Sequence, residues 1–230
     1  YARYGDLDDV IYFDCAEWLP AISFFDIQPD LEAGVPRSVA VLDRIGHYQE
    51  ILRQLMGAEQ YDRAIGSTDM IRDMLRALYD PIHGRDVVTN RGIRQALERF
   101  RSRKSPPAVS NPDLRDRLRG AVENDDPEIF RKVMNGAVNR VDKVSSSPHL
   151  NRVFNHRPSG IEADQPAFDF ADWLDDDVVI LFDTGRLQSE AKRGLTLVLL
   201  SNLWSSLRRR RRRNVNVDLP LVTVYLEEAA

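Results

Sequence analysis

The sequence predicts an α/β protein in which an all-helical insertion separates two parts of a mostly parallel sheet. Apolar runs suited to strands lie near both ends of the chain, whereas the middle holds helical patterns and chain breaks. Near the end, an apolar run, a long helical pattern and another apolar run follow one another. Strand, helix and strand at this spacing form a βαβ unit with parallel strands and a right-handed crossover. We therefore expect the α/β core in residues 1–60 and 161–230, and the insertion in residues 61–160.

The composition is that of a folded globular chain. Its 230 residues are enough for a substantial core, and 43% are hydrophobic while 30% are charged. No apolar run in the sequence approaches the roughly 20 residues that a membrane-spanning helix needs. The single cysteine, Cys15, excludes an internal disulfide and suits a reducing compartment. We interpret Cys15 as a small buried hydrophobic residue rather than a nucleophile.

The first part of the core is expected to hold a strand and a long helix. Residues 9–13 (DVIYF) are a strand candidate with Asp14 at its carboxyl end, preceded by a helix tail or exit loop in residues 1–7. An apolar patch around residues 22–25 predicts a short strand or an extended run. Apolar residues at helical spacing predict a helix over residues 38–56.

The insertion is recognised by its helix starts. Ser67 or Thr68 can cap one helix, and Asn90 can cap another. Prolines after Asn111 and Asp126 open two more, because proline is favoured in the first helical turn. We expect these helices near residues 68–79, 93–103, 112–122 and 127–141, followed by a loop-rich return over residues 145–168.

The second part of the core carries the strongest strand candidate. Residues 178–182 (VVILF) end at Asp183, and a helix with a wide apolar face is expected over residues 187–207. The final apolar run, residues 219–226, ends in two acids. A short apolar run of this kind suits a fully buried strand of a parallel sheet.

The two final acids suggest chemistry, because ligands of open α/β sheets bind beyond the carboxyl ends of the strands. Of two adjacent carboxylates there, one can help to hold Mg²⁺ and the other can polarise an attacking water. The run is similar to a Walker B segment, with Glu227 where an aspartate is usual and Glu228 next to it. The alternative is a core strand that ends in solvated charge.

Three features in order resemble a known ATPase core. They are VIYFDC near the start, the helical insertion, and FADWLDDDVVILFDTGRLQSEAKRGLTLVLLSNLWSSL leading into VTVYLEEAA. Together they look like the HerA/FtsK superfamily, in its type IV secretion and conjugative DNA-transfer branch. The resemblance implies part of a RecA-like P-loop sheet with an all-helical insertion.

The resemblance also implies a function. Glu227 would match the metal-associated acid, Glu228 the catalytic acid that activates water, and Asp14 an acid beside the bound nucleotide. Asp183 would hold a position nearer to architecture than to chemistry. The implied cofactors are ATP and Mg²⁺, and the implied partners are DNA or DNA–protein cargo, identical subunits in a ring (a hexamer), and other secretion or conjugation components. The implied location is the cytoplasm, or the cytoplasmic face of the membrane through parts outside this chain.

One departure from the family pattern is large. No G-x-x-x-x-G-K-[ST] occurs in the 230 residues, so we expect the phosphate-binding loop upstream of Tyr1 in a longer protein, and no ATP hydrolysis by this chain alone. Two alternatives stay open. One is a non-hydrolysing scaffold relative of the same fold, and the other is an unrelated DNA-binding α/β protein.

Two groups of basic residues could contact nucleic acid. One is a run of six arginines, for which the alternative is a solvated helix end where positive charge suits the helix dipole. The other lies in the insertion, where interleaved acids dilute the charge. The run consists of Arg208, Arg209, Arg210, Arg211, Arg212 and Arg213; the second group consists of Arg94, Arg99, Arg101, Arg103 and Lys104.

Overall fold

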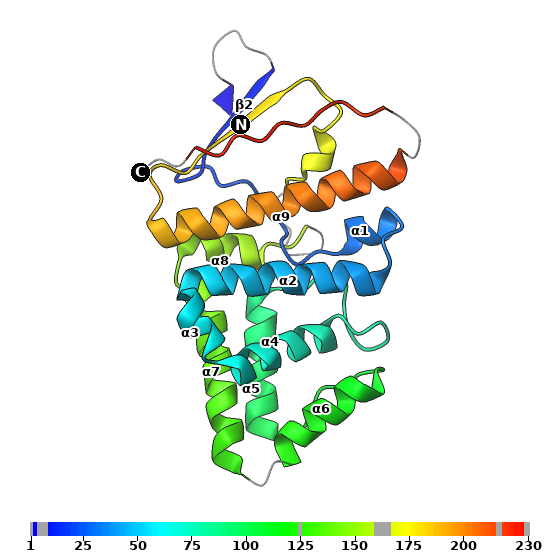
Figure 1. Cartoon of the computed structure of the whole chain (residues 1–230), viewed down its shortest axis with the longest axis vertical. Helices are drawn as coiled ribbons and strands as arrows, with labels where there is room; N and C mark the ends of the chain where they lie inside the picture. The colour runs from blue at the N-terminus through cyan, green and yellow to red at the C-terminus, as the bar shows by residue number, and fades with distance from the viewer. Residues whose placement is uncertain (1, 4–8, 124–125, 159–166, 215–217, 228–230) are drawn as a thin grey trace.

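The protein is mixed α/β, with many helices and a small sheet at one end of an elongated molecule (Figure 1). The computed structural model describes residues 2–3, 9–123, 126–158, 167–214 and 218–227. Within these residues the sheet has three strands in the order β1-β2-β3. In the described part of the chain, no helix combines the length and the apolar character needed to cross a bilayer.

The sheet contains a parallel pair, but not between the two strands of the expected βαβ unit, residues 178–182 and 219–226. Strand β2 (Val10–Asp14) pairs in parallel with β3 (Val179–Asp183), in a register that sets Val10 opposite Val179 and Asp14 opposite Asp183. The strands expected at 9–13 and 178–182 are therefore confirmed. Strand β1 (Ala2–Arg3) pairs antiparallel with β2, so the expected helix tail or exit loop over residues 1–7 is wrong at these two residues.

Two long helices pack against each other below the level of the strands in Figure 1. Helix α2 (Arg37–Met56) confirms the helix predicted over residues 38–56, and it packs against α9 (Ser189–Arg213). Figure 1 shows α9 running across the molecule between the level of the strands and α2. Helix α9 is longer than predicted, because the arginine run continues it by six residues beyond Leu207.

Within the insertion, the described residues of the range 61–160 form helices joined by loops, apart from an isolated β-bridge of Val87 with Asp26. Its helices stack away from the sheet toward the other end of the molecule (Figure 1). The pattern missed two of them: α3, which is only one turn long, and α8, which begins at a proline inside the region expected to be loop. The six helices are α3 (Ala58–Asp62), α4 (Ile65–Leu78), α5 (Asn90–Arg103), α6 (Pro112–Glu123), α7 (Pro127–Ser145) and α8 (Pro148–Asn155).

Two of the predicted helix caps are wrong. Helix α4 begins at Ile65 with Ala64 at its N-cap, so Ser67 and Thr68 lie inside the helix. Thr89, not Asn90, caps α5, and its side chain accepts a hydrogen bond from the Gly92 N–H. Asn90 is buried instead, where it accepts from the Tyr48 hydroxyl (2.5 Å) and donates to the carbonyl oxygen of Val141 (2.9 Å). This network ties the start of α5 to α2 and α7.

The region around residues 22–25 is buried but forms no strand. Phe24 and Phe25 pack with Tyr48 and Phe154, with ring centroids 4.8 Å apart for Phe24–Phe154 and 5.0 Å apart for Phe25–Tyr48. The edge-to-face geometry of these pairs is favourable for aromatic rings. The short helix α1 (Gln28–Glu32) follows. Aromatic packing therefore joins this region to the insertion, together with an isolated antiparallel bridge between Asp26 and Val87.

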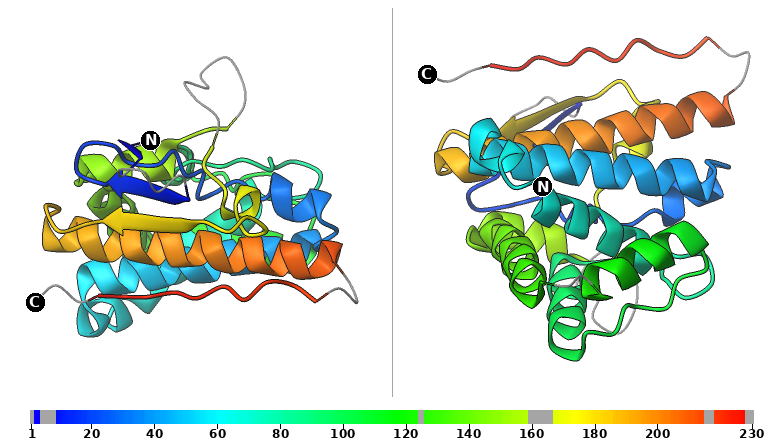
Figure 2. Two further views of the ribbon diagram at one scale, coloured as in Figure 1. Left: turned by 90° about the horizontal axis from the view of Figure 1, so that it is seen from above. Right: turned by 60° about the horizontal axis from the view of Figure 1, so that its bottom comes forward.

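The final apolar run does not form the expected buried strand. Residues 218–227 are extended without strand pairing, and no backbone hydrogen bond joins them to β3 among the described residues. Leu221 is 92% exposed and Tyr225 is 90% exposed. The segment runs back alongside α9, toward the end at which α9 begins (Figures 1 and 2). Its direction matches that of β3, as in a parallel crossover, but its side chains lack the expected burial.

Candidate functional site at the strand ends

The carboxyl ends of β2 and β3 bring two acids together. Asp14 and Asp183 are the last residues of their strands and lie opposite each other in the parallel register. The backbone N–H of Cys15 donates to the carbonyl oxygen of Asp183 (2.9 Å), which continues the pairing one residue further. Both acids thus lie at the edge where parallel sheets usually bind ligands.

Asp14 is held by a cation that the sequence did not reveal. The Arg186 guanidinium, in the turn after β3, forms an ion pair with Asp14 and donates to Glu17 (3.0 Å). Asp14 also accepts a hydrogen bond from the Ala16 N–H (3.1 Å). The carboxylates of Asp14 and Glu17 therefore share the Arg186 guanidinium, and Asp14 is already paired where a ligand would bind.

Asp183 is held by neutral donors. The Tyr12 hydroxyl donates to one carboxylate oxygen (2.7 Å), and the Gly185 N–H donates to the other (2.8 Å). The Tyr12 hydrogen bond, followed by that of Gly185, lowers the pKa of Asp183, since both stabilise the charged form. Asp183 is therefore ionised at neutral pH and positioned by the turn.

Cys15 is not a nucleophile in this arrangement. It is fully buried, and burial, followed by the nearby negative charge of Asp183, raises the pKa of its thiol to about 12. The thiolate is the reactive form of cysteine, and it is not populated at neutral pH with such a pKa. The interpretation of Cys15 as a buried hydrophobic residue agrees with this environment.

Of the two acids at the end of the final segment, the structure describes only Glu227. Glu227 lies in the exposed extended segment, and no hydrogen bond or ion pair joins it to another described residue. Glu228 lies outside the described residues. Among the residues that the structure describes, no group of three or more His, Cys, Asp or Glu side chains is placed to hold a metal ion. The described residues therefore do not place two acids side by side at the end of a buried strand, as the sequence had predicted.

The first half of the arginine run belongs to an interior ion network. Arg209 is 3% exposed and forms ion pairs with Asp30 and Asp169. Asp30 is 1% exposed and also pairs with Arg44 (3.3 Å) and Arg208 (3.4 Å). These contacts join α1, α2, α9 and the turn before the 3₁₀ helix of residues Phe170–Asp172.

The remaining arginines lie progressively further out. Arg210 is buried, with its guanidinium donating to Asp175 (2.7 Å) and to the carbonyl oxygen of Pro220 (3.0 Å). Arg212 donates to the carbonyl oxygen of Gly34 (3.0 Å), and Arg211, Arg212 and Arg213 are exposed. Acids therefore compensate the charge of the first part of the run, whereas the last three residues keep theirs facing solvent.

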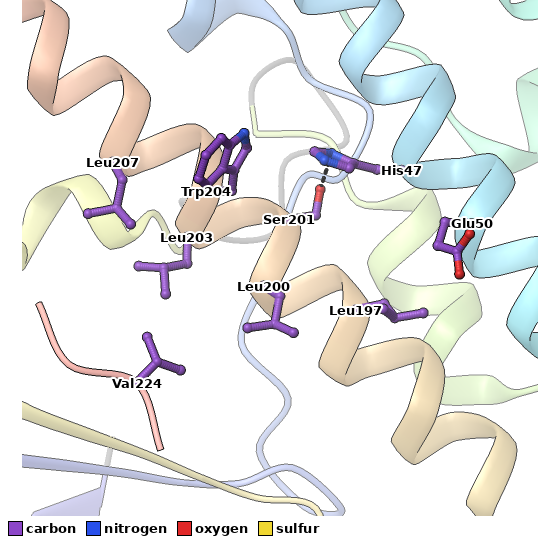
Figure 3. A pocket seen from close by; sticks show the side chains of 9 residues that line it. All are labelled: His47, Glu50, Leu197, Leu200, Ser201, Leu203, Trp204, Leu207 and Val224. Carbon is purple, nitrogen blue, oxygen red and sulfur yellow. Dashed lines mark hydrogen bonds between the residues drawn. The ribbon is translucent and has the colours of Figure 1, made fainter. Parts of the chain in front are cut away.

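A groove between α2, α9 and the final segment holds a Ser–His pair (Figure 3). Its volume is about 400 Å³, and leucines, Trp204 and Val224 form most of its wall. Ser201 Oγ lies 2.5 Å from His47 Nδ1. Burial, followed by the Arg44 charge, lowers the pKa of His47, so the imidazole is neutral and can accept the serine hydrogen. Both residues lie inside helices, where backbone N–H groups are used by the helix, so the pair is an interhelical hydrogen bond rather than a catalytic dyad.

Sequence reasoning placed the strand-end acids correctly but missed Tyr12, Glu17 and Arg186. One signal was present: Arg186 follows Asp183 by only three residues, in a turn in which the Gly185 N–H donates to the Asp183 carboxylate. No protein-family model, curated protein or solved structure matches this chain.

Proposed function

We propose that the chain is part of the core of an ATP-driven, DNA-moving motor of the conjugation or type IV secretion kind. The observation that carries the proposal is the in-register pair of acids, Asp14 and Asp183, at the carboxyl edge of two parallel strands. The helical insertion between those strands and the return of residues 218–227 alongside α9 add support. This order of elements follows the resemblance drawn from the sequence.

The chemistry would divide between the acids of the chain and groups outside it. Asp14 and Asp183 are engaged by Arg186, Tyr12 and Gly185, whereas the Glu227 carboxylate has no partner among described residues. Hard carboxylate oxygens suit Mg²⁺, so Glu227 is the acid that would hold the ion. Bound Mg²⁺ would neutralise charge on the β- and γ-phosphates of ATP. Glu228 would accept a hydrogen bond from the attacking water and orient it.

A second candidate is a scaffold relative that keeps the fold without hydrolysis. The observation that favours it is the pairing of Asp14 with Arg186, which neutralises one of the acids at the strand ends. The exposed final segment also favours it, because hydrolysis needs a carboxylate held firmly at the strand end.

The sequence and the ATPase activity of the full-length protein distinguish the two candidate functions. The motor requires G-x-x-x-x-G-K-[ST] shortly before the position of Tyr1, and Mg²⁺-dependent ATP hydrolysis by the purified protein. Glu228→Gln should abolish turnover and spare nucleotide binding, because the amide cannot accept the water proton. The matched control, Glu128→Gln at the exposed start of α7, should leave turnover unchanged. A broken or absent phosphate loop, or undiminished hydrolysis by Glu228→Gln, would contradict the motor.

A further inference from the structure

The outer face of α5 carries a line of polar side chains. Arg91, Gln95, Arg99 and Arg103 follow one another at intervals of four residues, and all four are exposed. The opposite face of α5, which includes Phe100, is buried in the core. A helix rises about 1.5 Å per residue, so neighbouring positions of this line are about 6 Å apart along the axis. We call these four residues the α5 stripe.

The arginines of the α5 stripe are not compensated by acids. Among the described residues, none of Arg91, Arg99 and Arg103 forms an ion pair. Their neighbour Arg94 differs, because it pairs with Asp142 (2.7 Å) and Glu98 (3.1 Å). The stripe therefore keeps three guanidinium groups free along a ridge that winds by about 40° around α5 at each step of four residues. Each guanidinium can donate two parallel hydrogen bonds.

A polar hollow lies beside Arg91 and Gln95, the first two residues of the α5 stripe. It has a volume of about 520 Å³ and is lined by three α5 side chains (Arg91, Arg94 and Gln95), by Asp142 and Ser145 of α7, by Ser146, and by Asn151 and Asn155 of α8. The Asp142 carboxylate in this wall is paired with Arg94 (2.7 Å). Asn155 fixes its wall, accepting from the Arg91 N–H (2.8 Å) and donating to the carbonyl oxygen of Asn151 (2.8 Å). Hydrogen bonds between described residues leave the Arg91 guanidinium and the amide NH₂ groups of Gln95 and Asn151 unused. Apart from the Gln95 amide oxygen, these unused groups are donors, and the Arg91 guanidinium adds a positive charge that suits an anionic oxygen ligand.

We propose that the α5 stripe binds the phosphate backbone of a nucleic-acid strand, with one phosphate in the polar hollow. Arginine forks match phosphate oxygens, and neutralising successive phosphates releases counterions. A linear row of cations fits a linear polyanion. A membrane surface fits less well, because a surface-bound helix buries its apolar face in lipid, whereas that face of α5 packs in the core. This contact does not depend on ATP hydrolysis and concerns a surface other than residues 208–213.

The test uses fluorescence anisotropy with a labelled single-stranded DNA of 20 nucleotides at several salt concentrations. The variant Arg91→Gln/Arg99→Gln/Arg103→Gln should bind at least about tenfold more weakly than the unmodified chain. The slope of log K against log salt should fall by about 2, since each lost phosphate contact on a single strand removes about 0.7. The matched control is Arg53→Gln/Arg63→Gln/Arg131→Gln, which removes the same charge from one half-buried and two exposed arginines elsewhere and should change affinity less than about threefold.

Three results would overturn the proposal. The first is the absence of salt-dependent DNA binding by the unmodified chain. The second is an equal loss in the control, which would show a response to net charge alone. The third is a loss in Arg211→Gln/Arg212→Gln/Arg213→Gln that matches or exceeds the loss in the stripe variant. Circular dichroism of every variant must match that of the unmodified chain, and the three single variants serve where the triple variant does not fold. Binding of poly-glutamate or phosphatidylserine vesicles in place of DNA also counts against the proposal.

Discussion

Two arginine-rich helical stretches differ sharply in their surroundings. On α9, Arg209 is 3% exposed and pairs with Asp30 and Asp169, whereas on α5 the arginines of the stripe face solvent without acid partners among the described residues. The acids around Arg209 come from α1 and from the turn before residues 170–172, far away in sequence. A dense run of arginines therefore does not by itself identify a binding surface. An arginine run is available to a ligand only where the fold does not bring carboxylates to the arginines.

The largest effect is expected from removing the acid at the centre of the α9 network. Asp30→Ala would leave Arg44 and Arg209 buried without their shared counter-charge. Breaking a buried ion pair by removing one partner costs about 3–5 kcal/mol of the free energy of unfolding. Urea unfolding followed by circular dichroism measures this loss. The control Asp62→Ala, at a carboxylate that is 61% exposed, should cost less than about 1 kcal/mol, and similar losses in both variants would refute the interior role of Asp30.

The next effect concerns an acid stabilised by neutral donors instead of arginine. Burial disfavours the charge of Asp80, but hydrogen bonds from Ser110, His83 and Ile82 outweigh it and lower the pKa to about 2. A depressed folded-state pKa stabilises the fold above the unfolded pKa near 4, and this stabilisation is lost as pH falls from about 4 to 2. The loss should be about 2 kcal/mol. Stability curves of the unmodified chain and of Asp80→Asn should converge toward pH 2, and parallel curves would contradict the assignment.

A smaller effect is expected where α5 is anchored. Tyr48→Phe removes the hydroxyl that donates to Asn90, and it leaves a buried amide oxygen without its donor. The expected loss is about 1–3 kcal/mol in the free energy of unfolding. Tyr225→Phe, at a ring that is 90% exposed, serves as the control and should be neutral. If Tyr48→Phe is equally neutral, the network does not hold the start of α5.

The smallest effect should come from the α5 stripe itself. Arg99→Ala removes an exposed cation that has no ion-pair partner among the described residues, so the free energy of unfolding should change by less than about 0.5 kcal/mol. Thermal unfolding measures this change. A loss above 1 kcal/mol would show that Arg99 supports the fold, and the contrast with α9 would then fail.

The sequence predicted the local features that depend on local chemistry. The apolar runs at 9–13 and 178–182 became β2 and β3, and the prolines after Asn111 and Asp126 are the first residues of α6 and α7. Asn90 was misread as a cap, since its role depends on Tyr48, a residue that lies on another helix. Tertiary partners of this kind cannot be inferred from spacing alone.

The final segment shows the same limit more strongly. Its apolar run resembles that of β3, but a strand also needs a neighbouring strand with which to form hydrogen bonds, and residues 218–227 have none among the described residues. At the candidate site, the sequence predicted that Asp14 and Asp183 end strands, but not that those two strands pair with each other. The pairing of Arg186 with Asp14 and Glu17 could not be predicted, because it depends on the path of the turn after β3.

The most direct test of the contrast between the two stretches compares Arg209→Met with Arg103→Met by urea unfolding. Methionine keeps much of the length of the side chain and removes the charge in both variants. We expect Arg209→Met to lose about 3 kcal/mol or more, because Asp30 and Asp169 lose a buried partner, and Arg103→Met to change by less than about 0.5 kcal/mol. Equal losses in the two variants would contradict the account.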